Sequence, residues 1–520
     1  MLGKNSRLYN SILNVGTTAM ATLFTMLLSV VVRAFLNRNL GTNYVGLTGI
    51  LTSVITSLSI TDLGIDSVFI YLLYKPMADR NTDEIGKLMV LFKRVYMWIG
   101  TFFLLLGVIC VPFLKYLVGA QAMRIPNIYL IFFLYLLNTG ISYFFAAYRV
   151  ILNADQKYYI IARITFLTTF VTNFLQIIGL LLIKSFVLYV ILLLLSTIAT
   201  NLIIGSVSIK RYGLRKLPRE RINNIKFEND ETIPTLIHNI IGGISNKLGV
   251  IFVNSSDNIM LANFETLRIV GMYSNYLMIT NGVSSLLSKM IASVTASVGN
   301  LGSEGNEGKN LTTFVKLTTI INFLVIMAVI PMSLFFGTFI NIWVGGKNIL
   351  PVVPTILITL NCLLAVIRYP ALTFIDAFGL QWIQRWKSIV ESAVNVGVAL
   401  ILLIVFKMGL NGVLLGTLCS NLLVVNWYEP FLVLREVCGR RYRQYLAEVI
   451  PAFALFIGAV LFSLGVLMSG VIGISLWRSL VVIVISEVIL LTIVYFVFRN
   501  SLGMELITSI FGRFFKRRTV

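Results

Sequence analysis

Long runs of apolar residues, separated by short polar connections, make up most of the chain. A helix that crosses the hydrocarbon core of a bilayer needs about 20 mostly apolar residues, and fourteen stretches reach that length. These stretches are 10–36, 44–74, 90–114, 126–151, 159–183, 186–209, 233–260, 268–298, 312–341, 351–378, 388–406, 410–433, 446–468 and 474–498. Because the runs are continuous rather than alternating, a transmembrane β-barrel is disfavoured. The pattern predicts an all-α integral membrane protein with about 14 transmembrane helices.

The composition supports the same class of protein. Of the 520 residues, 58% are hydrophobic and only 12% are charged, about half the charged fraction of a soluble domain. Lys and Arg outnumber Asp and Glu by 42 to 21, a net charge of +21. Thirty of the 42 basic residues, Arg149 and Lys387 among them, fall in the termini and the connections on the same side. Nine fall on the other side, including Arg33 near the outer end of the first span, and the remaining three, Lys247, Lys289 and Arg368, lie inside spans. This bias predicts that both termini are cytoplasmic, so the positive charge faces anionic membrane lipids and requires no nucleic-acid partner.

Residue types that carry metal or hydrolytic chemistry are scarce. The chain has one His and four Cys, and it lacks a CxxC pair. P-loop, GxSxG and HExxH patterns are also missing from the sequence. We therefore expect no metal, no resident cofactor and no enzymatic activity.

The sequence contains a weak internal repeat. A shift of 225 residues aligns Ile12–Asn14 with Ile237–Asn239, and Tyr44–Leu47 with Ile269–Met272. Six spans return the chain to its starting side, so the two copies are parallel, a design found in transporters whose substrate binds between the repeats. The predicted domains are an N-lobe 1–209, a basic cytoplasmic linker 210–232, a C-lobe 233–434, two appended helices 435–498, and a basic amphipathic cytoplasmic tail 499–520.

Short blocks spread over most of the chain resemble one transporter family. The blocks are Leu40–Gly49 with Thr61–Ile65, Ser256–Leu261 with Val270–Ser274, Asn153–Lys157, and Thr373–Gly379. They resemble Wzx-type polysaccharide (O-antigen, capsule and exopolysaccharide) flippases of the multidrug/oligosaccharidyl-lipid/polysaccharide (MOP) exporter superfamily. The resemblance implies two pseudo-symmetric six-helix lobes in a V around a central cavity. It also implies a substrate, an undecaprenyl-diphosphate-linked oligosaccharide, flipped from the inner to the outer leaflet of the bacterial cytoplasmic membrane by alternating access.

Basic residues within the spans are the candidates for binding the diphosphate. A charge inside the bilayer costs about 2.5–3.5 kcal/mol on insertion scales, so it marks a functional candidate by default. Lys247, Lys289 and Arg33 lie in the spans that line the cavity in the resembled fold. Arg368 is a weaker candidate, because a break at Pro370 would let its guanidinium reach a backbone carbonyl. The alternative for all four residues is an intramembrane ion pair or a snorkelling side chain.

Acidic residues within the spans are candidates for coupling transport to an ion, H⁺ or Na⁺. Asp62 and Asp66 are four residues apart, on one face of the second span, with an ion pair to Lys289 as the alternative. Asp257 belongs to a family-like block but could also cap a helix. The other acidic candidates are Asp376, Glu391 and Glu487.

Two adjacent glycines suggest a hinge in the seventh span. Gly242 and Gly243 remove side chains where a helix could bend. We hypothesise that bending there contributes to gating.

Two other functions stay open at the level of the sequence. One is a drug or cation exporter of the same superfamily, and the other is a membrane glycan polymerase or ligase. The short external connections disfavour the polymerase. We expect a monomer whose partners are lipid-linked oligosaccharide and membrane lipids, with the glycan polymerase machinery as a candidate protein partner.

Overall fold

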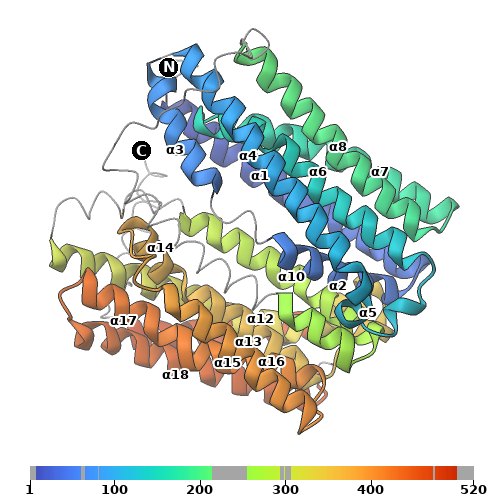
Figure 1. The fold of residues 1–520 in the computed structure, drawn as a ribbon. Coiled ribbons are helices and arrows are strands. Elements are labelled where there is room, and N and C mark those ends of the chain that lie inside the picture. The colour runs from blue at the N-terminus through green and yellow to red at the C-terminus, as the bar shows by residue number, and fades with distance from the viewer. Residues whose placement is uncertain are drawn as a thin grey trace, which may run out of the picture. The chain divides into compact units, whose positions relative to one another are not determined.

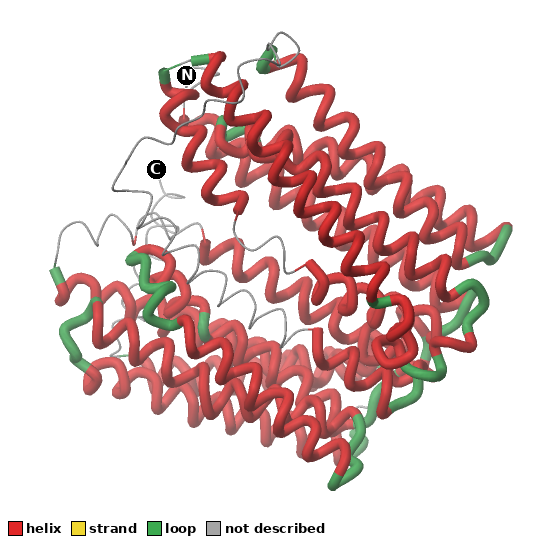
Figure 2. The backbone as a smooth tube through the Cα atoms, viewed as in Figure 1, coloured by secondary structure: helices red, strands yellow, loops and turns green. Residues whose placement is uncertain are grey.

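The computed structural model describes residues 7–59, 65–79, 81–213, 255–292, 298, 306–471, 473 and 475–499. All regular elements in these ranges are helices (Figure 2). The chain divides into two compact units, Met1–Gly271 and Met272–Val520. This division falls later than the predicted linker 210–232, because residues 255–271 pack on the helices of the first unit.

The first unit contains eight α-helices before residue 213. They are α1 (Arg7–Asn39), α2 (Thr42–Leu58), α3 (Ile65–Ala78), α4 (Thr82–Ile109), α5 (Leu114–Val118), α6 (Ile128–Ala154), α7 (Tyr158–Leu182) and α8 (Phe186–Arg211). Helix α6 packs against both α4 and α8, and α1 packs against α7 (Figure 1). The unit is therefore organised around α6.

Local sequence signals explain several of the helix boundaries. Asn81 begins α4 by accepting a hydrogen bond from the Glu84 amide, and Ser185 begins α8 by accepting one from the Leu188 amide. Both side chains satisfy N–H groups that have no partner within the helix. Between α1 and α2, Gly41 has a φ of 94°, a backbone conformation that glycine adopts without steric cost.

The second unit begins within a helix that starts in the first. Its elements are α10 (Leu267–Ala292), α12 (Glu307–Val344), α13 (Val352–Ile367), α14 (Tyr369–Ala377), α15 (Arg385–Ile404), α16 (Leu410–Ser420), the π-helix η7 (Asn421–Val425), α17 (Asn426–Glu436), α18 (Tyr442–Met468) and α19 (Leu476–Phe498). Helix α12 has 38 residues, and α18 and α19 both pack on it.

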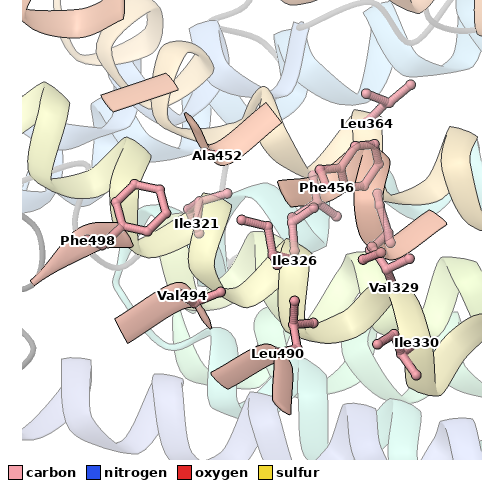
Figure 3. Packing of buried hydrophobic residues seen from close by; sticks show 14 of the residues in the cluster. Ile321, Ile326, Val329, Ile330, Leu364, Ala452, Phe456, Leu490, Val494 and Phe498 are labelled. Carbon is pink, nitrogen blue, oxygen red and sulfur yellow. The ribbon is translucent and has the colours of Figure 1, made fainter. Parts of the chain in front are cut away.

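Aliphatic and aromatic side chains from four helices form a core around α12. Figure 3 shows Ile321, Ile326, Val329 and Ile330 of α12 together with Leu364, Ala452, Phe456, Leu490, Val494 and Phe498. The predicted appended helices α18 and α19 are thus integral to the packing of the second unit.

Eleven helices among the described residues are long and apolar enough to cross a membrane. The predicted span 44–74 contains α2, with 17 residues, and α3, with 14, and residues 60–64 between them lie outside the described part of the chain. Most of the predicted span 233–260 lies outside the described residues. The all-α membrane fold is confirmed, and the total of about 14 spans remains a prediction.

Candidate functional site

Arg33 lies in the first unit among aromatic hydroxyl groups. It is six residues before the end of α1, and the phenols of Tyr135 on α6 and Tyr189 on α8 interact with it electrostatically. Gln176 of α7 donates a hydrogen bond to the Tyr189 carbonyl oxygen at 3.0 Å. Four helices thus bring polar groups to the end of the unit where α6 and α8 begin. Binding of diphosphate by Arg33 remains a prediction.

Asp66 occupies the first turn of α3 and is exposed. The Tyr96 hydroxyl of α4 donates a hydrogen bond to its Oδ1. Asp62, its predicted partner on the same helix face, lies outside the described residues. The tyrosine bond holds Asp66 against α4, and its role in ion coupling remains a prediction.

Asp257 is buried, with 7% of its surface exposed, in a helical segment that covers residues 255–264. The neighbouring Asn258 donates a buried hydrogen bond to Ser53 Oγ of α2 at 2.8 Å. This segment is therefore anchored to α2 within the first unit.

The remaining predicted site residues cannot be placed by their side chains. Lys247, Gly242 and Gly243 lie outside the described residues. Lys289 lies on α10, three residues before its end, and its side chain also falls outside the described part.

Arg368 belongs to a buried network of four charges in the second unit. Its Nε and Nη2 donate to the two carboxylate oxygens of Glu429, at 3.1 and 2.8 Å. Lys387 Nζ lies 2.7 Å from Glu429 Oε1 and 3.2 Å from Glu391 Oε2. Arg368 Nη1 lies 3.4 Å from Glu391 Oε1. Two cations therefore balance two carboxylates, the arrangement that charges need in a low-dielectric interior.

The network forms where two helices are interrupted. Arg368 lies between α13 and α14, directly before Tyr369 and Pro370. Glu429 follows the π-helix η7 and precedes Pro430. The sequence led us to expect a backbone carbonyl as the acceptor for Arg368. The other alternative, an intramembrane ion pair, is what the structure shows, because two carboxylates are close enough to bind the guanidinium more strongly than a neutral acceptor does. A role for Arg368 in binding diphosphate remains a prediction.

Sequence reasoning missed two members of this network, although a signal for each was present. Glu429 lies within the predicted span 410–433, and Lys387 lies one residue before the predicted span 388–406. Lys387 was counted only as an orientation charge, yet its side chain is 1% exposed.

Arg149 was also counted as an orientation charge, although it lies within the predicted span 126–151. It is on α6, and its Nη2 donates a hydrogen bond to Asn201 Oδ1 of α8 at 2.9 Å. Asn201 Nδ2 in turn faces Ser142 Oγ at 3.5 Å. Thr197 donates to Asn138 Oδ1 at 2.7 Å. Hydrogen bonds thus join α6 and α8 at successive levels, as polar side chains do between membrane helices.

Two glycines related by the 225-residue repeat meet within the first unit. A Cβ on Gly46 of α2 would overlap the carbonyl oxygen of Leu267, and a Cβ on Gly271 of α10 would overlap that of Thr42. The shift of 225 residues aligns Thr42 with Leu267 and Gly46 with Gly271. The contact is therefore reciprocal between the repeated positions, which supports the alignment derived from the sequence.

The fold is that of the MOP superfamily. A multidrug resistance MATE family transporter of this superfamily, in an inward-facing conformation, matches 84% of this chain and 98% of its own with a TM-score of 0.54 and 14% identity. The lipid II flippase MurJ, in an inward closed conformation, matches 92% of this chain and 98% of its own, with a TM-score of 0.56 and 14% identity. A MOP superfamily transporter from Pyrococcus furiosus covers 85% of this chain and 96% of its own, with a TM-score of 0.51 and 13% identity.

A family model described as polysaccharide biosynthesis protein matches residues 11–298, more than half of the chain. The chain therefore belongs to the polysaccharide biosynthesis protein family. No curated protein matches it. The resemblance to polysaccharide flippases of the MOP superfamily, drawn from the sequence, is confirmed by this family and by the fold.

Proposed function

We propose that this protein flips an undecaprenyl-diphosphate-linked oligosaccharide repeat unit from the inner to the outer leaflet of the bacterial cytoplasmic membrane. In broader terms it is a MOP-superfamily transporter of lipid-linked oligosaccharide. The observation that carries the proposal is membership of the polysaccharide biosynthesis family over residues 11–298. A structural neighbour described as a lipid II flippase adds support from the fold.

The chemistry of such a substrate explains what the helices must provide. A diphosphate carries about two negative charges, and moving it through hydrocarbon requires cations at membrane depth that replace lost hydration. The prenyl chain can remain among the lipids. Arg33, which interacts electrostatically with Tyr135 and Tyr189, offers one such cation. Lys247 and Lys289 remain candidates from the sequence.

Alternating access coupled to H⁺ or Na⁺ completes the proposal. Asp66 is the described candidate for the coupling site, because it is an exposed carboxylate that accepts the Tyr96 hydroxyl. A carboxylate within a span is the kind of group that a coupling ion needs.

A drug or cation exporter of the same superfamily is the competing function. A cavity for cations needs uncompensated carboxylates. In the described part of the second unit, Glu391 and Glu429 are neutralised by Arg368 and Lys387. These two carboxylates are therefore not available to a cationic drug, and membership of the polysaccharide biosynthesis family favours the anionic substrate.

Deletion of the gene, followed by analysis of lipid-linked intermediates, tests the proposal. We expect complete repeat units to accumulate on the inner leaflet, where an impermeant periodate reagent cannot reach their sugars in intact spheroplasts. Complementation with the intact gene is the control. Accumulation of unpolymerised units on the outer leaflet would favour a polymerase instead, and unchanged intermediates would favour the exporter.

A further inference from the structure

Arg149 is a cation inside a predicted span, and its side chain reaches Asn201 on the neighbouring helix α8. It lies five residues before the end of α6, and its acceptor Asn201 lies ten residues before the end of α8. At 1.5 Å per residue, Asn201 is roughly 15 Å from that end. Helical side chains tilt towards the helix N-terminus, which for α6 is the opposite end of the membrane. A snorkelling arginine would extend towards the near interface, so its role is not that of an anchor.

No carboxylate among the described residues lies within ion-pair distance of Arg149. Among the described residues it forms no ion pair, and its Nε is buried without a hydrogen-bond partner. Asp66 attracts it electrostatically, but the Oδ1 of that carboxylate accepts the Tyr96 hydroxyl. Arg368 presents the opposite case, because two carboxylates surround it.

This pattern of partners is suited to an anion that arrives and leaves. Leaving a buried donor unsatisfied costs about 1–3 kcal/mol, and more for a charged group. Asn201 is fully buried, and its amide oxygen orients the guanidinium without cancelling its charge. A planar, oriented guanidinium is the group best matched to phosphate oxygens.

We propose that Arg149 binds the diphosphate of the prenyl-linked substrate where α6 and α8 approach the cytoplasmic side, with Asn201 as its positioning residue. This proposal rests on the proposed function and adds a binding residue on α6. Arg33 lies beside Tyr135 at the other end of α6. Tyr135 and Arg149 are 14 residues apart, roughly 20 Å along the helix axis, so the first unit would offer a cation near each membrane surface.

The test is native mass spectrometry of the purified full-length protein, titrated with undecaprenyl diphosphate and, separately, with phosphatidylglycerol. The masses of the bound lipids distinguish the substrate lipid from a bulk anionic phospholipid. The variants are Arg149→Gln, Arg149→Lys and Asn201→Asp. The last has nearly the same shape as the native side chain but places a carboxylate on the guanidinium. The matched control is Arg163→Gln, which removes an exposed cation that packs on the Tyr159 ring of α7.

We expect Arg149→Gln and Asn201→Asp to weaken binding of undecaprenyl diphosphate by about 10-fold or more, with phosphatidylglycerol little affected. Arg149→Lys should fall between these variants and the native protein, because lysine keeps the charge but loses the planar fork. Arg163→Gln should bind normally.

Three results would overturn the assignment, and they are distinguishable. Normal binding by Arg149→Gln and Asn201→Asp would remove Arg149 from the site while leaving the proposed function intact. Equal loss of binding for undecaprenyl diphosphate and phosphatidylglycerol would show that Arg149 belongs to a general phospholipid site. Failure of the native protein to bind undecaprenyl diphosphate would overturn the proposed function as well.

Discussion

At the scale of single residues, Arg368 and Arg149 show two contrasting ways of holding a charge within the membrane helices. Arg368, Lys387, Glu391 and Glu429 neutralise one another in a network with almost no solvent contact. Arg149 has an amide as its hydrogen-bond acceptor. The first kind stabilises a particular helix arrangement, whereas the second leaves electrostatic attraction available for another molecule.

Replacing Glu429 with Gln should destabilise the protein strongly. Arg368 and Lys387 would then face Glu391 alone, and breaking a buried ion pair from one side costs about 3–5 kcal/mol. We expect a clear fall in the thermal unfolding midpoint of the detergent-solubilised protein, measured by size-exclusion chromatography after heating.

Glu487→Gln is the matched control for this prediction. Glu487 Oε1 is buried on α19 without a hydrogen-bond partner among the described residues. Removing its charge should leave the unfolding midpoint unchanged or raise it. Equal midpoints for both variants would contradict the view that the network stabilises the second unit.

The sequence predicted part of this residue-scale picture. Arg368 was identified because it lies inside an apolar run, and an ion pair was one of the alternatives considered for it. Its partners could not be chosen, because Glu391 and Glu429 are 23 and 61 residues away from it. Only the packing of three helix segments brings them together. Arg149 and Lys387 were misread because a charge close to the end of an apolar run resembles an orientation signal.

At the scale of helices, α2 crosses the start of α10 at two glycines that the sequence repeat aligns with each other. The repeat paired Gly46 with Gly271, and the structure places the backbone of each segment where the other would carry a Cβ. Glycine at such a crossing lets backbones approach directly.

Gly46→Ala and Gly271→Ala should each destabilise the protein by at least about 1–3 kcal/mol, the usual cost of overpacking. The obstacle is a carbonyl oxygen of the backbone, which cannot rotate away as a side chain could. Gly458→Ala on α18 is the control, because a Cβ there meets no atom within 4 Å. It should be neutral or stabilise by about 0.4–1 kcal/mol. Midpoints for Gly46→Ala and Gly271→Ala that match this control would refute the close crossing.

Helix interruptions were the harder feature to predict. The breaks at Pro370 and at η7 lie within apolar runs that were each expected to form one span. Proline marks the first break in the sequence. Pro430 lies five residues after η7 and removes a helical hydrogen bond to the carbonyl of Asn426, but it does not by itself specify a π-helix, which depends on an extra residue being accommodated by its neighbours.

At the scale of the whole molecule, the distribution of basic residues predicts which ends of the helices face the cytoplasm, and this orientation can be measured. Lys184 follows α7, Arg211 ends α8, and both are exposed. The predicted orientation puts Lys184 outside the cell and Arg211 in the cytoplasm.

Single cysteines at these two positions should react oppositely with a membrane-impermeant maleimide. Lys184→Cys should be labelled in intact cells, and Arg211→Cys only after permeabilisation, in a background with Cys110, Cys362 and Cys419 replaced by Ala. Cys438, between α17 and α18, can stay, because burial raises the pKa of its thiol to about 12 and the thiolate is the reactive form. Labelling of Arg211→Cys in intact cells would show that the orientation is the reverse of the predicted one.

The reciprocal contact of Gly46 and Gly271 also limits how the two halves of the sequence can change. Exchanging the two segments leaves the contact the same, which is the defining property of the isologous interface in a two-fold dimer. Here one polypeptide supplies both sides. A larger residue at Gly46 would clash with the backbone carbonyl of Leu267, and one at Gly271 would clash with that of Thr42. Because each obstacle is backbone, a side-chain change in the other repeat cannot remove the clash. The two repeats are therefore held to glycine at the point where each faces its own copy.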